Sequence, residues 1–245
     1  MKALILAAGY GTNLYPITNH KPKALLTIKG RPIIEYILAR LECLNDINEV
    51  LIITNHRYIK EFQKWFQDYP AAIPIRLIDD GSTNEKDKLG SMGDIAFAIR
   101  QAKIEDDLLV IGGDNIFSFS LNKFIEYARN LQSASFIGTF DLNGRYQPKK
   151  FGVIKLDTQS RVVDFQEKPA VRPESTLVAM CLYYFPKDKL SLINEYLNQK
   201  TGAEEAGHYI SWLFKKDIVY GYTFNEGSWF DIGDIDSYTE AVFTF

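Results

Sequence analysis

Residues 1–23 read MKALILAAGYGTNLYPITNHKPK, and this stretch decides the fold of the chain. The apolar run ALIL leads directly into a bend that contains Gly9 and Gly11, and Lys21 and Lys23 follow on either side of a proline. Glycine allows a backbone to approach a ligand closely, and successive free N–H groups in such a bend bind anions. A lysine beside the bend supplies a mobile positive charge for a phosphate. The stretch therefore predicts a buried strand that ends in a phosphate-binding bend.

The composition limits the class of protein. The chain has 245 residues, of which 46% are hydrophobic, and this is enough to bury a large core. A net charge of −3 gives no general attraction to nucleic acid or to anionic lipid. No apolar run approaches the length of a membrane span, and no signal-peptide pattern precedes the first strand. We therefore expect a cytoplasmic protein with no nucleic-acid or membrane partner, and we expect Cys43 and Cys181 to be buried, reduced thiols.

Apolar runs alternate with amphipathic segments in the first half of the chain. The runs predict strands at residues 2–7, 50–54, 73–78 and 108–112. Apolar residues at helical spacing predict helices near residues 34–41, 62–69, 93–101 and 124–131. Strands that alternate with helices form right-handed, parallel βαβ units. We therefore expect an α/β fold with a mostly parallel, Rossmann-like sheet that is flanked by helices.

The pattern changes near Ala134. Strand-like segments at residues 133–142, 151–157, 161–169 and 177–185 follow one another without long helical patterns between them. Helical patterns return only around residues 190–197 and 209–214, and an apolar strand at 218–224 and a short helix complete the chain. The second half is therefore expected to be richer in β-structure than the first.

Two aspartates are expected near strand ends, where ligands bind in an open α/β sheet. Asp114 lies in Gly-Asp-Asn directly after the strand at 108–112, and Asp231 lies between bulky apolar neighbours near the end of the chain. Two carboxylates suit Mg²⁺, which takes one or two protein carboxylates besides phosphate oxygens and water. Each aspartate has an ordinary structural alternative as a turn or cap residue. The glycine bend matches neither a dinucleotide fingerprint nor a Walker loop.

Five motifs together resemble the sugar-1-phosphate nucleotidyltransferases, the NDP-sugar pyrophosphorylases. The opening stretch is similar to their LxAAGxGTRLxPxTxxxPKxL signature, and the matching residues are Leu6, Ala7, Ala8, Gly9, Gly11, Thr12, Leu14, Pro16, Thr18, Pro22, Lys23 and Leu25. The other motifs follow in the family's order: LGSMG at 89–93, GDN at 113–115, EKP at 167–169 and WFDIG at 229–233. The resemblance implies a GT-A-like fold in a single domain of residues 1–245, with a nucleotide-binding part at about 1–133 and a sugar-binding part at about 134–245.

The resemblance also implies a chemistry. A phosphate oxygen of a sugar 1-phosphate attacks the α-phosphorus of a nucleoside triphosphate in line, and pyrophosphate leaves. Since the nucleophile is already an anion, catalysis depends on positioning and electrostatics, with Mg²⁺ as cofactor. The implied nucleotide-binding residues are Leu6, Ala8, Gly9, Gly11, Thr12, Asn13, Lys23 and Gly90. The implied sugar-phosphate-binding residues are Gly152, Glu167, Lys168 and Trp229. Lys23 and Asp114 are the implied catalytic residues, and Asp114 and Asp231 are the implied metal ligands.

The chain departs from the family pattern at two places. The family's arginine after Gly-Thr is Asn13 here, which supplies neither the charge nor the bidentate fork for the outer phosphates. Lys21 or Arg31 could compensate for that loss. Residues 179–181 read Ala-Met-Cys where the family has Asn-Ala-Gly, and this leaves the identity of the sugar open.

The expected substrates are small molecules, dTTP or UTP with glucose 1-phosphate, because Gly-Asp-Asn favours that branch over the GDP-mannose branch. One alternative is a weakened or inactive regulatory paralogue that binds nucleotide or NDP-sugar, which Asn13 and the Ala-Met-Cys sequence at residues 179–181 support. Another is a cytidylyltransferase for a non-sugar phosphate, which explains WFDIG less well. The chain stops soon after WFDIG, so a single enzymatic step is expected without a β-helical acyltransferase extension. Assembly as a homo-oligomer stays open.

Overall fold

β1 (Lys2–Leu6), the strand predicted from the opening residues, has a parallel neighbour on each side in the computed structural model. The structure describes residues 1–131, 133–142, 150–171, 173–199 and 205–245. β4 (Glu49–Thr54) pairs with one edge of β1 and β6 (Leu108–Gly112) with the other, and β5 (Ile75–Asp79) lies beyond β4. The order β5-β4-β1-β6 confirms the Rossmann-like parallel half, and the predicted strands match the observed ones to within about two residues.

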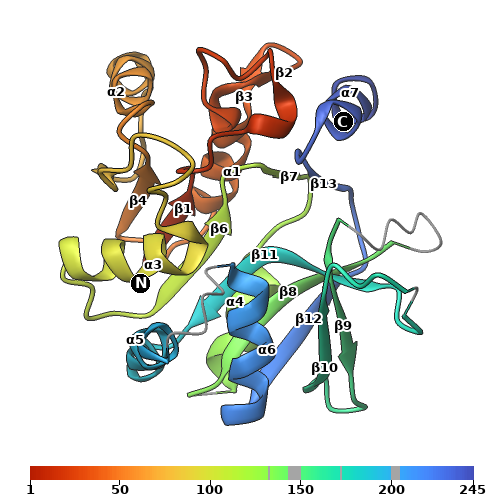
Figure 1. Cartoon of the computed structure of the whole chain (residues 1–245). Coiled ribbons are helices and arrows are strands. Elements are labelled where there is room, and N and C mark those ends of the chain that lie inside the picture. Colours follow the sequence, from red (N-terminus) through yellow and green to blue (C-terminus); the bar gives the residue numbers. More distant parts are fainter. Residues whose placement is uncertain (132, 143–149, 172, 200–204) are drawn as a thin grey trace.

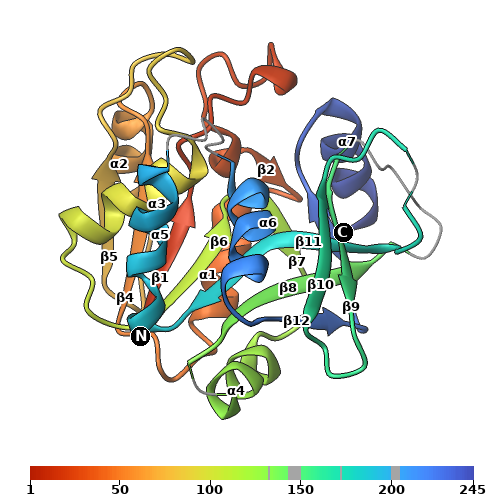
Figure 2. The ribbon, with the colours of Figure 1, turned by 60° about the horizontal axis from the view of Figure 1, so that its bottom comes forward.

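Helices flank both faces of the sheet because the strands carry apolar side chains on both faces. In β1, Ala3 and Ile5 belong to one hydrophobic core and Leu4 belongs to a second core on the opposite face. The first core contains side chains of α1 (Ile33–Leu41), α2 (Ile59–Asp68) and α4 (Asn122–Asn130). The second contains side chains of α3 (Gly90–Gln101), α5 (Ser191–Asn198) and α6 (Ala206–Lys216), which Figure 2 shows together on one face of the sheet.

The second half of the chain continues the same sheet with mostly antiparallel pairs, and only β12 pairs parallel, with β8, among the described strands of this half. β11 (Leu177–Phe185) pairs antiparallel with β6 and so joins the two halves (Figure 1). The other strands of this half are β8 (Ser135–Asp141), β9 (Gly152–Leu156), β10 (Val162–Glu167) and β12 (Val219–Phe224). The prediction of a strand-rich second half is confirmed, and a short 3-10 helix, η3 (Lys187–Lys189), leads from β11 toward α5.

A layer of small elements lies beyond the carboxyl ends of the parallel strands. It contains η1 (Thr12–Leu14), η2 (Lys23–Leu25), the hairpin of β2 (Thr27–Ile28) and β3 (Arg31–Pro32), and the pair of β7 (Asn115–Phe117) and β13 (Trp229–Asp231). The last helix, α7 (Ile235–Thr244), begins with a capping box between Asp234 and Ser237. A third core joins α7 and β13 to the segment after β1 through Ala241, Phe230 and Leu14. The end of the chain thus packs against its beginning.

Among the described residues, no helix is both long enough and apolar enough to cross a membrane. The division at about residue 133 stays a prediction, although the strand-rich part does begin at β8, directly after α4.

Candidate functional site

The candidate site lies where the chain leaves β1 and β6. These strands are neighbours, with Leu6 opposite Gly112. The strand that follows β1 in the sheet lies toward one edge, and the strands that follow β6 lie toward the other edge, which makes this a topological switch point. The Gly113 N–H donates to the Leu6 carbonyl at 2.8 Å. A Cβ on Gly113 would lie only 2.7 Å from that carbonyl oxygen. Glycine is therefore required here, and it brings the predicted phosphate bend and Asp114 together.

The glycine bend after β1 has a fixed backbone. Gly11 has φ +65° and starts η1, and Thr18 Oγ1 donates to its carbonyl at 2.7 Å. Asn55, at the end of the neighbouring strand β4, donates through Nδ2 to the Ala8 carbonyl at 2.7 Å. Gly9, Thr12 and Asn13 are exposed, whereas Ala8 is buried and Leu6 is half-buried. The bend therefore presents Gly9, Thr12 and Asn13 to solvent, while Tyr10 between them is buried, on a backbone that two side chains hold in place.

Lys23 and Asp114 form a direct ion pair. Lys23 Nζ donates to Asp114 Oδ2 at 2.6 Å, and both side chains are mostly buried. Lys23 lies at the start of η2, after an extended proline, and Asp114 follows β6. The structure thus brings the two predicted catalytic residues into contact, although 91 positions separate them in the sequence.

Asp231 reaches the same place through the pairing of β13 with β7. Asp231 lies opposite Asn115, and the Ile232 N–H donates to the Asp114 carbonyl at 3.0 Å. Trp229 fixes this pairing, because its indole N–H donates to Asn115 Oδ1 at 2.6 Å in the buried interior. The predicted role of Trp229 at the sugar phosphate stays untested, but its only indole donor is already engaged inside the protein. The role of Asn115 was not predicted, although it belongs to the GDN motif.

The electrostatics of the site favour a bound cation. Burial raises the pKa of Asp231 to about 7, the Asp114 carboxylate adds to the shift, and Lys23 opposes it. Burial alone would lower the pKa of Lys23, but Asp114 and Asp231 outweigh it and raise that pKa. Two crowded carboxylates that share one ammonium carry excess negative charge, and such a pair fits Mg²⁺. Among the described residues, no group of three or more His, Cys, Asp or Glu side chains has metal-binding geometry, so any metal here would rely on two carboxylates and substrate oxygens.

Glu167 and Lys168 form a second charged group at the end of β10. Lys168 has φ +43°, and its Nζ lies 3.6 Å from Glu167 Oε1 and 3.1 Å from Glu205 Oε2. Burial raises the pKa of Glu167, while Lys168 opposes the shift. Gly152 faces this carboxylate from β9, where a Cβ would lie 2.9 Å from Glu167 Oε2. Lys168 also lowers the pKa of Asp231, so the two charged groups are within electrostatic reach of each other.

Gly90 lies at the first position of α3 and has φ +69°. The next residue, Ser91, accepts a hydrogen bond from the Ala206 N–H through its Oγ at 2.7 Å. The start of α3 is thereby tied to the start of α6. The predicted contact of Gly90 with the base stays a prediction.

The two cysteines differ from the expectation. Cys43 is exposed, so the prediction of a buried thiol is wrong for it, because it follows the end of α1 and lies off the apolar stripe of that helix. Cys181 is half-buried and has φ +52° in a bulged part of β11, where the family has glycine. Burial raises the pKa of its thiol, and Asp114 and Asp231 add to this shift. Cys181 therefore borders the two carboxylates as a neutral thiol.

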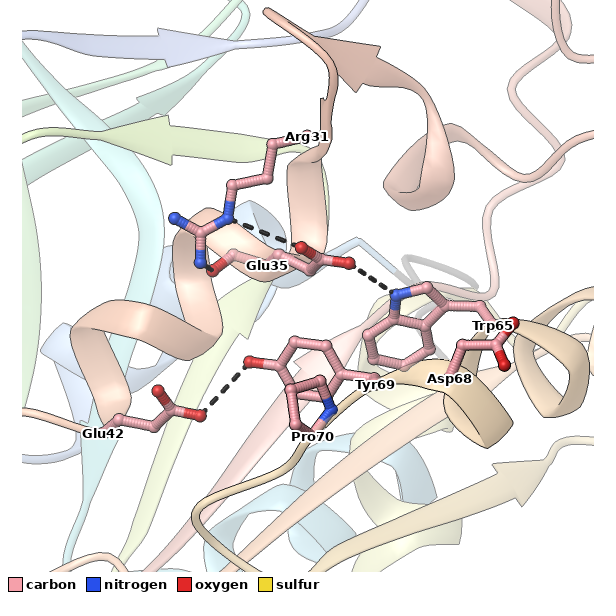
Figure 3. Close-up of a pocket in the computed structure, with 7 residues that line it drawn as sticks. All are labelled: Arg31, Glu35, Glu42, Trp65, Asp68, Tyr69 and Pro70. Atoms are coloured by element: carbon pink, nitrogen blue, oxygen red, sulfur yellow. Dashed lines mark hydrogen bonds and ion pairs between the residues drawn. The ribbon is translucent and has the colours of Figure 1, made fainter.

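Arg31, which the sequence suggested as a substitute for the arginine that Asn13 replaces, pairs with Glu35, and its compensating role stays a prediction. Its Nε lies 3.5 Å from Glu35 Oε2, and its Nη2 donates to the Glu35 carbonyl at 2.7 Å. This pair lies in a groove with a volume of about 540 Å³. Figure 3 shows the pair beside Trp65 and Tyr69.

Arg57 is a cation that the sequence analysis did not single out. It donates to the Tyr15 hydroxyl at 3.3 Å and to the Asn19 carbonyl at 2.8 Å, in the segment after the bend. No pattern in the sequence marked Arg57.

Comparisons with known proteins agree with this geometry. The nucleotidyl transferase family model matches residues 2–244. A relative from Methanocaldococcus jannaschii named bifunctional protein GlmU is 33% identical over 236 residues, which cover 95% of this chain and 51% of that protein. A bifunctional sugar-1-phosphate nucleotidylyltransferase/acetyltransferase from Sulfurisphaera tokodaii is 32% identical over 233 residues, which cover 95% and 52%. The chain therefore spans about half the length of these curated relatives.

A solved structure supports the fold. A protein from Bacillus anthracis described as a glucose-1-phosphate thymidylyltransferase superposes with a TM-score of 0.80 at 24% identity, over 99% of this chain and 94% of that one. This confirms the expected α/β fold of a nucleotidyltransferase. Since the family model matches almost every position and relatives exceed 30% identity, the resemblance inferred from the motifs is confirmed, and the chain belongs to the nucleotidyl transferase family.

Proposed function

We propose that this protein transfers a nucleotidyl group from a nucleoside triphosphate to a sugar 1-phosphate and releases pyrophosphate. The observation that carries the proposal is the meeting of Lys23, Asp114 and Asp231 at the switch point between β1 and β6, beside the exposed glycine bend. A site for this reaction must hold two anions and neutralise the charge that develops on the α-phosphate. Family membership supports the same reaction.

Each group has a role in this proposal. The backbone of Gly9 to Thr12 holds the triphosphate, and Lys23 neutralises the α-phosphate while Lys168 holds the sugar phosphate. Glu167 accepts hydrogen bonds from sugar hydroxyls. Asp114 and Asp231 hold Mg²⁺, which when bound acts as a Lewis acid on a phosphate oxygen. Lys23 pairs with Asp114 in this structure, so in this proposal Lys23 exchanges that partner for a phosphate oxygen when the substrate binds.

For the substrates we propose dTTP or UTP and glucose 1-phosphate. The Gly-Asp-Asn motif supports this choice, and the B. anthracis structure is of a protein described as acting in that branch. The curated relatives carry other names, so the base and the sugar are decided by assay. A pocket lined by apolar groups distinguishes uracil from thymine only weakly, because the two differ by one methyl group.

The test is pyrophosphate release with Mg²⁺ over a matrix of nucleoside triphosphates and sugar 1-phosphates. We expect turnover with at least one pair and loss of turnover when Mg²⁺ is removed with EDTA. Asp114→Ala should abolish turnover while the protein stays folded, and Asp188→Ala, which changes an exposed aspartate of η3, serves as the matched control.

If the protein binds nucleotide but turns over no substrate pair, the regulatory alternative is favoured. Asn13, which is exposed, supports that alternative because it is the position at which the opening signature is broken. Turnover only with CTP and a non-sugar phosphate would favour the alternative that the protein is a cytidylyltransferase.

A further inference from the structure

The Glu167 carboxylate lies between two glycines that come from different elements. A Cβ added to Gly152 on β9 would lie 2.9 Å from Glu167 Oε2, and a Cβ added to Gly207 on α6 would lie 1.7 Å from the same oxygen. The Cβ at Gly207 would also lie 2.5 Å from the Cδ atom of Glu167. Atoms that are not bonded to each other cannot approach this closely, so the carboxylate occupies the space that a side chain at position 207 would fill.

The backbone of α6 gives no other reason for a glycine at this position. Gly207 is the second residue of α6 and is absent from the residues with positive φ. Alanine is a better helix former than glycine in such a position. The glycine therefore serves the neighbouring carboxylate and not the helix.

The helix cannot move away to make room for a larger residue. The Ala206 N–H donates to Ser91 Oγ at 2.7 Å, and Ser211 Oγ donates to the Phe165 carbonyl at 3.3 Å. Tyr209 and Ile210 are buried in the second core. The flexible end of Glu167 is the part that can move, so a methyl group at position 207 displaces the carboxylate and leaves the fold intact.

We propose that Gly207 is a positioning residue that sets where the Glu167 carboxylate meets the sugar. This inference rests on the proposed function, in which Glu167 accepts hydrogen bonds from sugar hydroxyls. Gly207 leaves the space that one carboxylate oxygen occupies, and Gly152 faces the same oxygen, although a Cβ there would first meet Phe165 Cζ at 2.4 Å; Lys168 lies 3.6 Å from the other oxygen. The start of α6 thereby defines which hydroxyls of the sugar 1-phosphate the site accepts, without touching the sugar itself.

The test uses Gly207→Ala, Glu167→Ala and the double variant, with Thr239→Ala at an exposed interior position of α7 as the control for an added helix former. The first readout is the thermal midpoint, which does not depend on activity. Gly207→Ala should raise the midpoint more in the Glu167→Ala background than in the native background, because the carboxylate no longer occupies the space. The proposal is overturned if the changes in the thermal midpoint caused by the two single substitutions add up to the change in the double variant.

The second readout is the KM for each substrate in the full-length protein. Gly207→Ala should raise the KM for the sugar 1-phosphate by about tenfold or more and leave the KM for the nucleoside triphosphate unchanged. An unchanged KM for the sugar 1-phosphate would overturn the proposal, as would an equal rise for both substrates. If the native protein turns over no substrate pair, the proposed function fails. The non-additive change in thermal midpoint between Gly207→Ala and Glu167→Ala still decides whether Gly207 positions the Glu167 carboxylate.

Discussion

Replacing Asp231 with asparagine should stabilise the metal-free protein, and the gain should grow as the pH rises. Asp231 has a pKa of about 7 in the folded protein, raised from 3.8, chiefly because it is buried and secondly because Asp114 repels it. Between about pH 4 and pH 7, the folded state therefore retains a proton that the unfolded state has released. The free energy of unfolding falls through this window, and an uncharged asparagine removes the loss.

The expected size follows from the difference between the two pKa values. Each pKa unit is worth about 1.4 kcal/mol, so ionising Asp231 costs the folded state up to about 4 kcal/mol above pH ~7. At about pH 5, only the first part of the window has been crossed, and the cost is about 2 kcal/mol. For a chain of this length, the larger value corresponds to a rise of the order of 10 °C in Tm.

The assay is thermal and urea unfolding of the native protein and Asp231→Asn in EDTA, at about pH 5 and about pH 8.5. Asp234→Asn is the matched control, because the fold lowers the pKa of Asp234 whereas it raises the pKa of Asp231. Burial opposes the charge of Asp234, but Lys150 at 2.5 Å and Ser237 lower its pKa, so its ionised form stabilises the fold. Asp234→Asn should therefore destabilise the protein at about pH 8.5. A variant Asp231→Asn that gains no stability at that pH, or gains equally at both, would refute the reasoning.

Three other predictions concern the bend and its supports. Asn13→Arg should tighten triphosphate binding by roughly tenfold or more through a charge-assisted hydrogen bond, and an unchanged Kd in titration calorimetry would contradict it. Trp229→Phe should lower the free energy of unfolding by about 1–3 kcal/mol, because it leaves Asn115 Oδ1 without its buried donor; urea unfolding checks this. Gly113→Ala should destabilise the protein by about 1–3 kcal/mol, since its Cβ would press on the Leu6 carbonyl at 2.7 Å, and a native urea midpoint would disprove the close approach.

The parallel half of the fold was predictable because its strands are apolar on both faces. Such runs, as in β6 where every residue is buried, stand out from the amphipathic helices between them. The antiparallel pairing of β11 with β6 was not predictable, since the partners are about 70 residues apart and no local pattern specifies a partner strand. The exposure of Cys43 was mispredicted because Leu41 and Leu44 beside it are buried on a different face of the turn.

The candidate site was predictable in its residues but not in its contacts. Motif order singled out Lys23, Asp114 and Asp231, but only the fold shows that Lys23 pairs with Asp114. Gly207 carried no signal in the sequence, because its importance depends on α6 packing against the end of β10. Such contacts between distant segments arise from packing, and neither periodicity nor spacing encodes them.

The central claim is that a phosphate oxygen of the sugar 1-phosphate attacks the α-phosphorus of the triphosphate at Lys23, Asp114 and Asp231. The most direct measurement follows ¹⁸O placed in the non-bridging phosphate oxygens of the sugar 1-phosphate, by ³¹P NMR of the products. Attack of a sugar-phosphate oxygen on the α-phosphorus predicts that all of the label stays in the NDP-sugar, partly in the new bridge between the two phosphorus atoms, and that the pyrophosphate carries none. Label in pyrophosphate or orthophosphate, or no consumption of any substrate pair, would contradict the account.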